Sequence, residues 1–178
     1  DGPLALAARH GALCYLDELL EARTDTTVLL HPLADTRRVL PLERCGELMH
    51  AHADFQLVVS YNPGYQGLHK SLKPSTRQRF VALGFDHPEP SLEAAIVAQE
   101  GGVDEALALR LVQLAVRTRR MTDAGLNEGA STRMLVHAAL LVRAGLPPQA
   151  AALQAMADPL SDDPELLAVL HALVRASF

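Results

Sequence analysis

The sequence predicts a chain of two parts, an α/β portion over residues 1–90 and an all-helical portion over residues 91–178. Leucine and alanine, two strong helix formers, occur 32 and 28 times among the 178 residues, whereas valine occurs 13 times and isoleucine once. We therefore expect helices to dominate and any sheet to be small. Because 49% of the residues are hydrophobic and 21% are charged, intrinsic disorder is excluded. No apolar run approaches the roughly 20 residues that a membrane-spanning helix needs.

Short apolar runs separated by turn residues predict the strands of the first portion. The runs at 13–16 and 57–61 lack the alternation of a half-buried strand, which predicts neighbouring parallel strands buried on both faces. A further run at 81–85 predicts the last strand. Two shorter runs flank the turn residues at 34–36, and they predict a hairpin near residues 27–42.

Capping residues mark the helices after residue 90, where we expect a bundle of about five helices. Asp104 is expected to cap a long helix whose apolar residues fall on one stripe. Ser131 is expected to cap a second helix, which ends at Gly145. Asp163 is expected to cap the last helix, with Pro164 at its first position.

Polar side chains follow both of the predicted buried strands. Asp17 and Glu18 come directly after the run at 13–16, and Asn62 follows the run at 57–61. Because ligands bind at the carboxyl ends of parallel strands, we expect these residues in one crevice. Asp17 would hold Mg²⁺ through water, and Glu18 would orient and polarise an attacking water. The structural alternative is that Asp17 caps a helix and Asn62 opens a turn.

Two arginines are candidate phosphate contacts. Arg133 lies in the first turn of a predicted helix, where a cation opposes the macrodipole by roughly 0.3–1 kcal/mol and a bound triphosphate would offset that cost. Arg79 precedes the predicted last strand and is a candidate to reach a phosphate on a neighbouring subunit. Each arginine has the alternative of an ordinary surface charge. The two lysines, Lys70 and Lys73, do not follow glycine, and the sequence contains no G-x-x-x-x-G-K-[ST] loop.

Charge, cysteine and histidine usage exclude other classes. The net charge of −5 gives no basic face for nucleic acid. Cys14 and Cys45 stand apart without a CxxC pattern, which predicts reduced thiols in a cytoplasmic protein, and the sequence shows no signal peptide. His50 and His52 are expected to be surface histidines. A metal-dependent hydrolase built on them and the carboxylate pair would lack a third ligand.

The order of these motifs resembles that of MoxR-type AAA+ ATPases, in the subgroup of the CbbQ, NirQ, NorQ and GvpN proteins, over essentially the whole chain. The segment Cys-Tyr-Leu-Asp-Glu at 14–18 looks like the Walker B strand of the family, and Ser-Tyr-Asn-Pro-Gly-Tyr at 60–65 looks like its sensor 1 segment. Residues 72–80 resemble the stretch that carries the arginine finger. Glu-Gly-Ala-Ser-Thr-Arg at 128–133 resembles the sensor 2 motif that opens a lid helix.

The resemblance implies a P-loop AAA+ core followed by a helical lid domain. It makes Arg79 the arginine finger, with Arg77 in reserve, and Arg133 the sensor 2 residue. The hairpin near 27–42 would be the pre-sensor insertion that faces a central pore. Such ATPases carry the Walker A loop and first strands before the Walker B strand, so we expect this chain to start after them. We expect it, alone, not to hydrolyse ATP.

The resemblance also implies ATP and Mg²⁺ as cofactors and a hexameric ring as the homo-oligomer. The family works with a partner that has a von Willebrand factor A domain, and it activates or remodels client enzyme complexes, among them rubisco and nitric oxide reductase. Composition supports a different class as the alternative, a non-catalytic helical protein-interaction module. In that module Asp17 and Glu18 would be helix caps, and the arginines would be surface charges.

Overall fold

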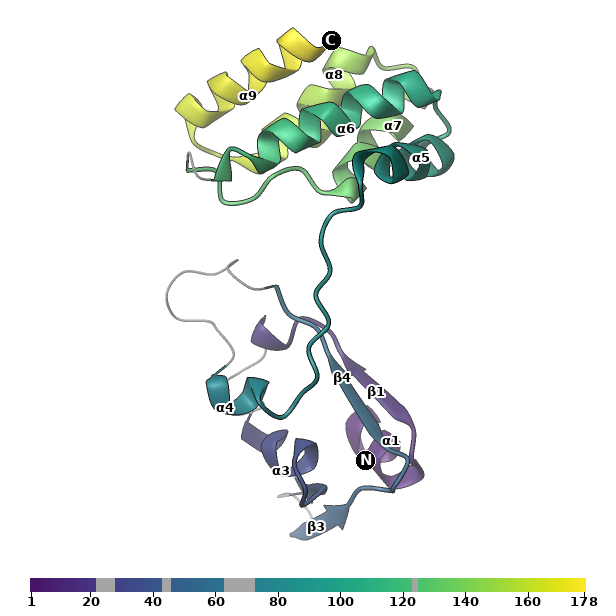
Figure 1. The fold of residues 1–178 in the computed structure, drawn as a ribbon, viewed down its shortest axis with the longest axis vertical. Helices are drawn as coiled ribbons and strands as arrows, with labels where there is room; N and C mark the ends of the chain where they lie inside the picture. The colour runs from purple at the N-terminus through teal and green to yellow at the C-terminus, as the bar shows by residue number, and fades with distance from the viewer. Residues whose placement is uncertain (22–27, 43–45, 63–72, 123–124) are drawn as a thin grey trace. The chain divides into compact units, whose positions relative to one another are not determined.

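The computed structural model describes residues 1–21, 28–42, 46–62, 73–122 and 125–178 (Figure 1). The chain forms two compact units, Asp1–Gly84 and Phe85–Phe178. The division falls a few residues before the boundary at residue 90 that the sequence predicts. No helix among the described residues is both long and apolar enough to cross a membrane.

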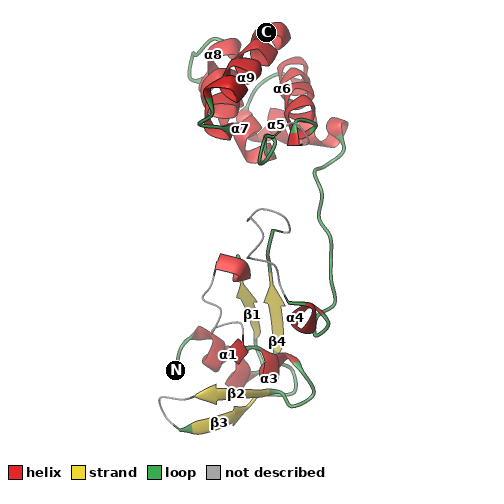
Figure 2. Cartoon of the chain, turned by 90° about the vertical axis from the view of Figure 1, so that its left-hand side faces the viewer, coloured by secondary structure: helices red, strands yellow, loops and turns green. Residues whose placement is uncertain are grey.

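A two-stranded parallel sheet lies at the centre of unit Asp1–Gly84 (Figure 2). It pairs β1 (Leu13–Leu16) with β4 (Gln56–Val59), and Leu16 lies opposite Val59. Helix α1 (Pro3–His10) precedes β1 and packs its alanines into the same apolar cluster as Cys14. The predicted parallel pairing of the two apolar runs is confirmed.

The predicted burial of these strands on both faces is wrong for the described residues. Cys14 is buried, but Leu13 and Tyr15 on its two sides have exposed fractions of 60% and 55%, and Val58 of β4 is 41% exposed. Side chains of a strand alternate between the two faces of its sheet. The described part of the chain covers the face that Cys14 occupies, so the other face stays open.

The hairpin lies later in the chain than the sequence predicts. Strands β2 (Val39–Leu42) and β3 (Glu47–His50) pair antiparallel, with Val39 opposite His50. The predicted hairpin near 27–42 is wrong in its first strand, the run at 28–30, because Val28 and Leu29 are helical and α3 (His31–Ala34) follows directly. Leu29, Leu30 and Leu33 recur at helical spacing, and the proline in the first turn of α3 favours a helix start.

The last predicted strand, at 81–85, is also wrong. These residues have no strand partner among the described residues, and Val81, Leu83 and Phe85 have exposed fractions of 93%, 79% and 93%. A β-strand requires a hydrogen-bonding neighbour, which an apolar sequence alone does not supply. The segment before it contains the short helix α4 (Pro74–Arg77), and the short 3₁₀ helix η1 (Leu19–Glu21) follows β1.

The described residues of unit Phe85–Phe178 form helices joined by loops, with no strand among them (Figure 1). Helices α5, α6 and α7 contact one another, and α9 packs on α6. Its helices are α5 (Pro90–Gly101), α6 (Glu105–Arg119), α7 (Thr132–Arg143), α8 (Pro148–Ala152) with its π-helical and 3₁₀ continuations η4 (Leu153–Ala157) and η5 (Asp158–Leu160), and α9 (Pro164–Ser177).

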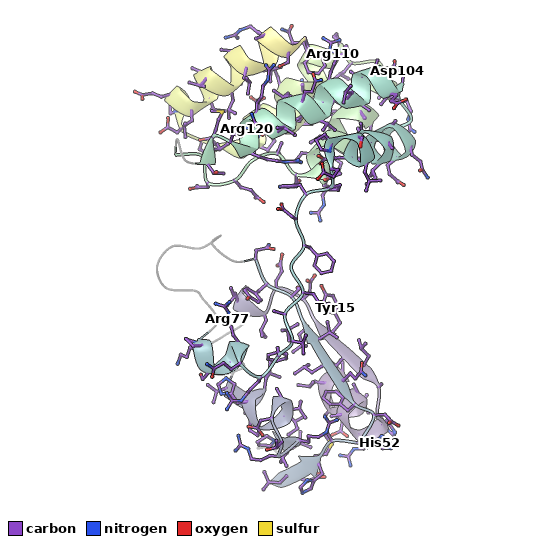
Figure 3. The ribbon with its side chains drawn as sticks, in the orientation of Figure 1. Tyr15, His52, Arg77, Asp104, Arg110 and Arg120 are labelled. Carbon is purple, nitrogen blue, oxygen red and sulfur yellow. The ribbon has the colours of Figure 1, made fainter. Side chains whose placement is uncertain are left out.

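Two of the three predicted helix caps are confirmed. Asp104 accepts a hydrogen bond from the backbone N–H of Leu107 at 2.7 Å, at the start of α6 (Figure 3). Asp163 caps α9 and accepts from the backbone N–H of Glu165 at 2.8 Å. Ser131 stands at the cap position of α7, but its side chain makes no capping hydrogen bond, so that part of the prediction is wrong.

Small residues let α5 and α7 approach closely. A Cβ on Gly101 of α5 would lie 2.3 Å from the Cβ of Ala139 in α7. Both positions belong to the buried part of the helices, together with Ala94 and Ala138. The abundance of alanine in the sequence therefore serves close helix packing in this unit.

Candidate functional site

Hydrogen bonds join the carboxyl ends of β1 and β4. The Ser60 hydroxyl donates to Asp17 Oδ1 at 2.5 Å, and the Tyr15 hydroxyl donates to the same oxygen at 2.7 Å. The backbone N–H of Glu18 donates to Ser60 Oγ at 3.0 Å. Backbone bonds reinforce the junction, since Ser60 N–H donates to the carbonyl of Leu16 at 3.0 Å. One serine thus contacts both carboxylate-bearing residues.

The environment of Asp17 keeps its carboxylate ionised. The hydrogen bond from Ser60, followed by that from Tyr15, holds the pKa of Asp17 below its ordinary value. The side chain is exposed at the end of the sheet. An exposed, ionised carboxylate suits a water-mediated contact to Mg²⁺. One hydroxyl comes from Tyr15 of β1 and the other from Ser60, the residue after β4, so the carboxylate accepts from side chains rather than from the backbone N–H groups that a helix cap would bind.

Glu18 has an unusual backbone conformation. Its φ is +50°, in the left-handed region, which costs a non-glycine residue about 1 kcal/mol. The hydrogen bond from its N–H to Ser60 holds this conformation, and its side chain is exposed. Strained backbone of this kind is concentrated at functional sites. Glu18 therefore presents its carboxylate to solvent beside Asp17.

Asn62 lies two residues after Ser60 and is exposed. The structure brings its strand beside the strand of Asp17 and Glu18. Within the described residues Asn62 makes no hydrogen bond to either carboxylate, and the remainder of the sensor 1-like segment lies outside them. The roles of Asp17, Glu18 and Asn62 in catalysis stay predictions.

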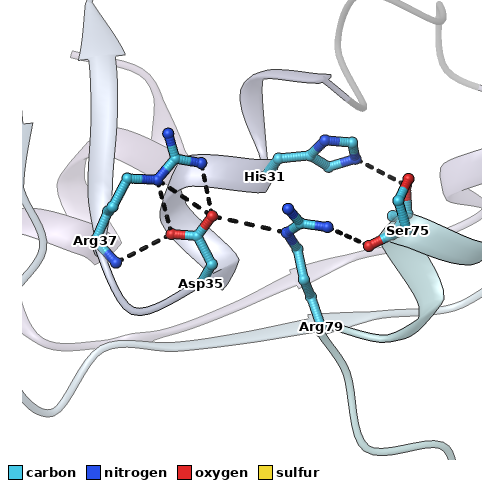
Figure 4. A network of polar contacts seen from close by, with 6 residues as sticks. His31, Asp35, Arg37, Ser75 and Arg79 are labelled. Atoms are coloured by element: carbon cyan, nitrogen blue, oxygen red, sulfur yellow. Dashed lines mark hydrogen bonds and ion pairs between the residues drawn. The ribbon is translucent and has the colours of Figure 1, made fainter.

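Arg79, the candidate arginine finger, contacts two groups of its own unit (Figure 4). Its Nη1 donates to the backbone carbonyl of Ser75, and its Nε lies 3.7 Å from Asp35 Oδ2. Asp35 is more tightly bound to Arg37, whose Nη2 donates to the same oxygen at 2.6 Å. Hydrogen bonds from Arg37 hold the pKa of Asp35 far below its ordinary value. Asp35 therefore stays a carboxylate and a partner for both arginines.

Arg77, the reserve candidate, is differently placed. It is exposed and ends α4, as Figure 3 shows. Next to it, Thr76 is buried and its Oγ1 lies 2.7 Å from His31 Nε2, which ties α4 to α3. The two arginines therefore differ in environment, since Arg77 is exposed and Arg79 lies beside Asp35. The role of each stays a prediction.

Arg133 lies in the first turn of α7, in unit Phe85–Phe178, and is exposed. The structure confirms its place in the first turn of a helix, which contains no acidic residue. Within the described residues Arg133 has no ion-pair partner. An exposed guanidinium at the positive end of a helix is suited to an anion.

The candidate histidines and cysteines form no metal site among the described residues. Among the residues that the structure describes, no three His, Cys, Asp or Glu side chains gather as metal ligands. His52 Nδ1 accepts from the backbone N–H of Asp54 at 3.2 Å. Burial raises the pKa of the Cys14 thiol, which disfavours the reactive thiolate. Cys45 lies outside the described residues.

Sequence reasoning missed two residues that organise these regions. Ser60 was part of a recognised segment, but it had no assigned role. Glu93 in α5 is fully buried, and its carboxylate binds Arg119 and Thr132. Its sequence signal is its position four residues before the buried Val97, which places a carboxylate on the apolar face of the helix.

Family models cover both units of the chain. Residues 1–80 match an AAA domain of the dynein-related subfamily, and residues 93–177 match the CbbQ/NirQ/NorQ C-terminal region. Over all 178 residues the chain is 54% identical to the protein CbbQ of Hydrogenophilus thermoluteolus and covers 67% of it. The chain belongs to the CbbQ/NirQ/NorQ family. The MoxR-type subgroup that the motifs predicted is confirmed.

Other CbbQ/NirQ/NorQ proteins are similar to the chain at 54–58% identity. The chain is 58% identical over 174 residues to the denitrification regulatory protein NirQ of Pseudomonas aeruginosa, which includes 98% of this chain and 67% of that protein. It is 54% identical over its full length to the protein NorQ of Paracoccus denitrificans and covers 66% of it. The chain spans about two thirds of the length of these curated relatives. An AAA domain joined to a CbbQ-type helical region is thus its architecture.

Proposed function

We propose that this chain belongs to an ATP-hydrolysing AAA+ chaperone that remodels or activates an enzyme complex. The observation that carries the proposal is the junction of β1 and β4, where Ser60 contacts Asp17 through its hydroxyl and receives the N–H of Glu18. It holds the carboxylate of Asp17 and the backbone of Glu18 at the carboxyl end of parallel strands, where ligands bind. Membership of the CbbQ/NirQ/NorQ family supports the same conclusion.

The proposed roles follow from the charge and exposure of each group. Asp17, ionised and exposed, would hold Mg²⁺ through water, and the ion would neutralise charge on the transferring phosphoryl group. Glu18 would orient and polarise the attacking water, and Asn62 would hydrogen-bond that water or a phosphate. Arg133 of α7 would contact a phosphate as sensor 2. Positioning and charge stabilisation account for most of the catalysis in such reactions.

The proposed assembly rests on the resemblance and on the relatives. We propose a hexameric ring in which Arg79 reaches the nucleotide of the neighbouring subunit, with a partner that has a von Willebrand factor A domain. The client would be an enzyme complex such as rubisco or nitric oxide reductase. One relative is named a denitrification regulatory protein, which is compatible with a client of the second kind.

Magnesium dependence tests the proposal. Because the 178 residues contain no G-x-x-x-x-G-K-[ST] loop, the complete gene product is purified and its ATP hydrolysis is measured against Mg²⁺ concentration. We expect Mg²⁺-dependent hydrolysis, and we expect Asp17→Asn to raise the Mg²⁺ requirement about tenfold or more. Asp54 is an exposed carboxylate of the same unit, so Asp54→Asn is the matched control and should leave the Mg²⁺ requirement unchanged. A wild-type protein that binds or hydrolyses no ATP would instead support the helical interaction module.

A further inference from the structure

A buried ion pair joins α5 to α6 in unit Phe85–Phe178. Glu93 has an exposed fraction of 0%, and its two carboxylate oxygens accept hydrogen bonds from the Arg119 guanidinium at 2.7 and 2.8 Å. A third hydrogen bond comes from Thr132 Oγ1 at 2.6 Å. A buried carboxylate is costly unless it is paired and hydrogen-bonded, and these three contacts meet that requirement. Because Thr132 is the first residue of α7, the pair connects three helices.

The same arginine holds the loop that leads into α7. Arg119 Nε donates to the carbonyl of Ala130 at 2.9 Å, and the N–H of Ala130 donates to Thr118 Oγ1 at 3.0 Å. Gly129 lies so close to α6 that a Cβ on it would be 2.4 Å from the Cα of Arg119. These contacts fix the position of the loop before α7, and of the start of α7, against α6.

Thr132 and Arg133 are neighbours in the first turn of α7, and Thr132 is the one whose side chain is hydrogen-bonded to another helix. Ser131, at the cap position, makes no capping hydrogen bond, and Arg133 is exposed. The turn contains no acidic residue to complement the positive helix end. The hydrogen bond from Thr132 to the Glu93 carboxylate therefore fastens this turn to α5.

We propose that Glu93 and Thr132 are positioning residues for Arg133, and that the hydrogen bond between them fixes the direction in which Arg133 meets the phosphate of the nucleotide. The inference rests on the proposed function, since Arg133 is assigned there to the nucleotide. It adds that the orientation of this arginine is set by the Glu93–Arg119 pair, through Thr132, rather than by the usual cap at the helix start.

A double-mutant cycle in the complete gene product tests the inference. Thr132→Val removes the hydroxyl but keeps the Glu93–Arg119 pair, Thr132→Ser restores the hydroxyl, and Thr122→Val is the control. The hydroxyl of Thr122 donates to the carbonyl of Arg119 at 3.1 Å and is exposed. We expect Thr132→Val to lower kcat/KM for ATP about fivefold when Arg133 is present, and to have no effect in the Arg133→Ala background. Thr132→Ser and Thr122→Val should behave like wild type.

A second measurement needs no nucleotide. Hydrogen–deuterium exchange of the backbone over residues 131–136 should be faster in Thr132→Val and unchanged in the serine and control variants. If Thr132→Val lowers kcat/KM equally with and without Arg133, Thr132 has a merely structural role and the inference is overturned. The inference is also overturned if Thr132→Val changes neither the exchange nor the activity. If Arg133→Ala itself leaves binding and hydrolysis of ATP intact in an active enzyme, the assignment of Arg133 in the proposed function fails instead, and with it this inference.

Discussion

Ser60 at the end of β4 donates a hydrogen bond of 2.5 Å to the carboxylate of Asp17 at the end of β1. The same hydroxyl oxygen accepts the N–H of Glu18 at 3.0 Å. The serine therefore couples a candidate Mg²⁺ contact to the candidate residue for polarising water. It lies in the segment that resembles sensor 1, so one side chain contacts both candidate residues.

Replacing Ser60 by alanine should weaken both contacts. The pKa of Asp17 should rise toward its ordinary value, because the largest contribution that lowers it is lost. The N–H of Glu18 loses its partner, and we expect the kcat of ATP hydrolysis in the complete gene product to fall about fivefold. Ser91→Ala, at an exposed position in α5, is the control. A Ser60→Ala enzyme with wild-type kcat would show that this coupling has no part in turnover.

Mixed oligomers should reveal whether Arg79 acts on a neighbouring subunit. Arg79→Ala and Glu18→Gln proteins should each be inactive alone, because each lacks one half of every site. When they are mixed and reassembled, activity should return to about a quarter of the wild-type level, the fraction of interfaces with both intact residues in a head-to-tail ring. The readout is steady-state ATP hydrolysis. If mixing Arg79→Ala with Glu18→Gln restores no activity but mixing Arg77→Ala with Glu18→Gln does, Arg77 is the arginine finger instead.

The ion pair of Glu93 predicts a stability that depends on pH. Burial raises the pKa of Glu93, but the hydrogen bonds from Arg119 and Thr132 outweigh burial, so the pKa in the folded protein is below its ordinary value. The carboxylate is also near His87, whose positive charge would lower the pKa further.

A lowered pKa in the folded state stabilises the protein above the ordinary pKa of glutamate, about 4.3, and this contribution is lost as pH falls through the lowered value. We expect the urea midpoint of the helical unit to drop more steeply below about pH 4.3 in wild type than in Glu93→Gln. Midpoints measured from pH 6 to pH 3 provide the comparison. Parallel curves for the two proteins would contradict it.

Gly129 should tolerate no side chain. A Cβ there would be 2.4 Å from the Cα of Arg119, which belongs to the backbone of α6 and moves only with the helix. Gly129→Ala should destabilise the helical unit by about 1–3 kcal/mol in urea unfolding. Gly84→Ala, where a Cβ would meet nothing within 4 Å, should leave stability unchanged. Equal stability of the two variants would contradict this close approach.

The sequence predicted elements that local chemistry determines. Asp104 and Asp163 cap helices because a carboxylate at that position satisfies backbone N–H groups of the first turn, whatever surrounds the helix. The apolar runs before Asp17 and Asn62 predicted the parallel pairing, because their composition favours adjacent strands. The position of the two carboxylates after β1 followed from the same pattern.

Contacts between distant residues were not predictable in the same way. The run at 28–30, expected as the first strand of the hairpin, is helical at Val28 and Leu29 and leads into α3, because the spacing of Leu29, Leu30 and Leu33 fits a helix as well as a strand. The run at 81–85 is as apolar as a strand, yet no described residue pairs with it. The bond from Ser60 to Asp17 and the bond from Thr132 to Glu93 join residues 43 and 39 apart, and only the folded chain brings them together.

The most direct test of the account is the hydrolysis and binding of ATP by Glu18→Gln in the complete gene product. Glutamine keeps the size of Glu18 but cannot polarise water as a carboxylate does, so hydrolysis should fall by about 100-fold or more while ATP still binds. Glu47→Gln, an exposed glutamate of β3, should match wild type in both. Turnover by Glu18→Gln at the wild-type rate would contradict the central claim that this carboxylate acts in ATP hydrolysis.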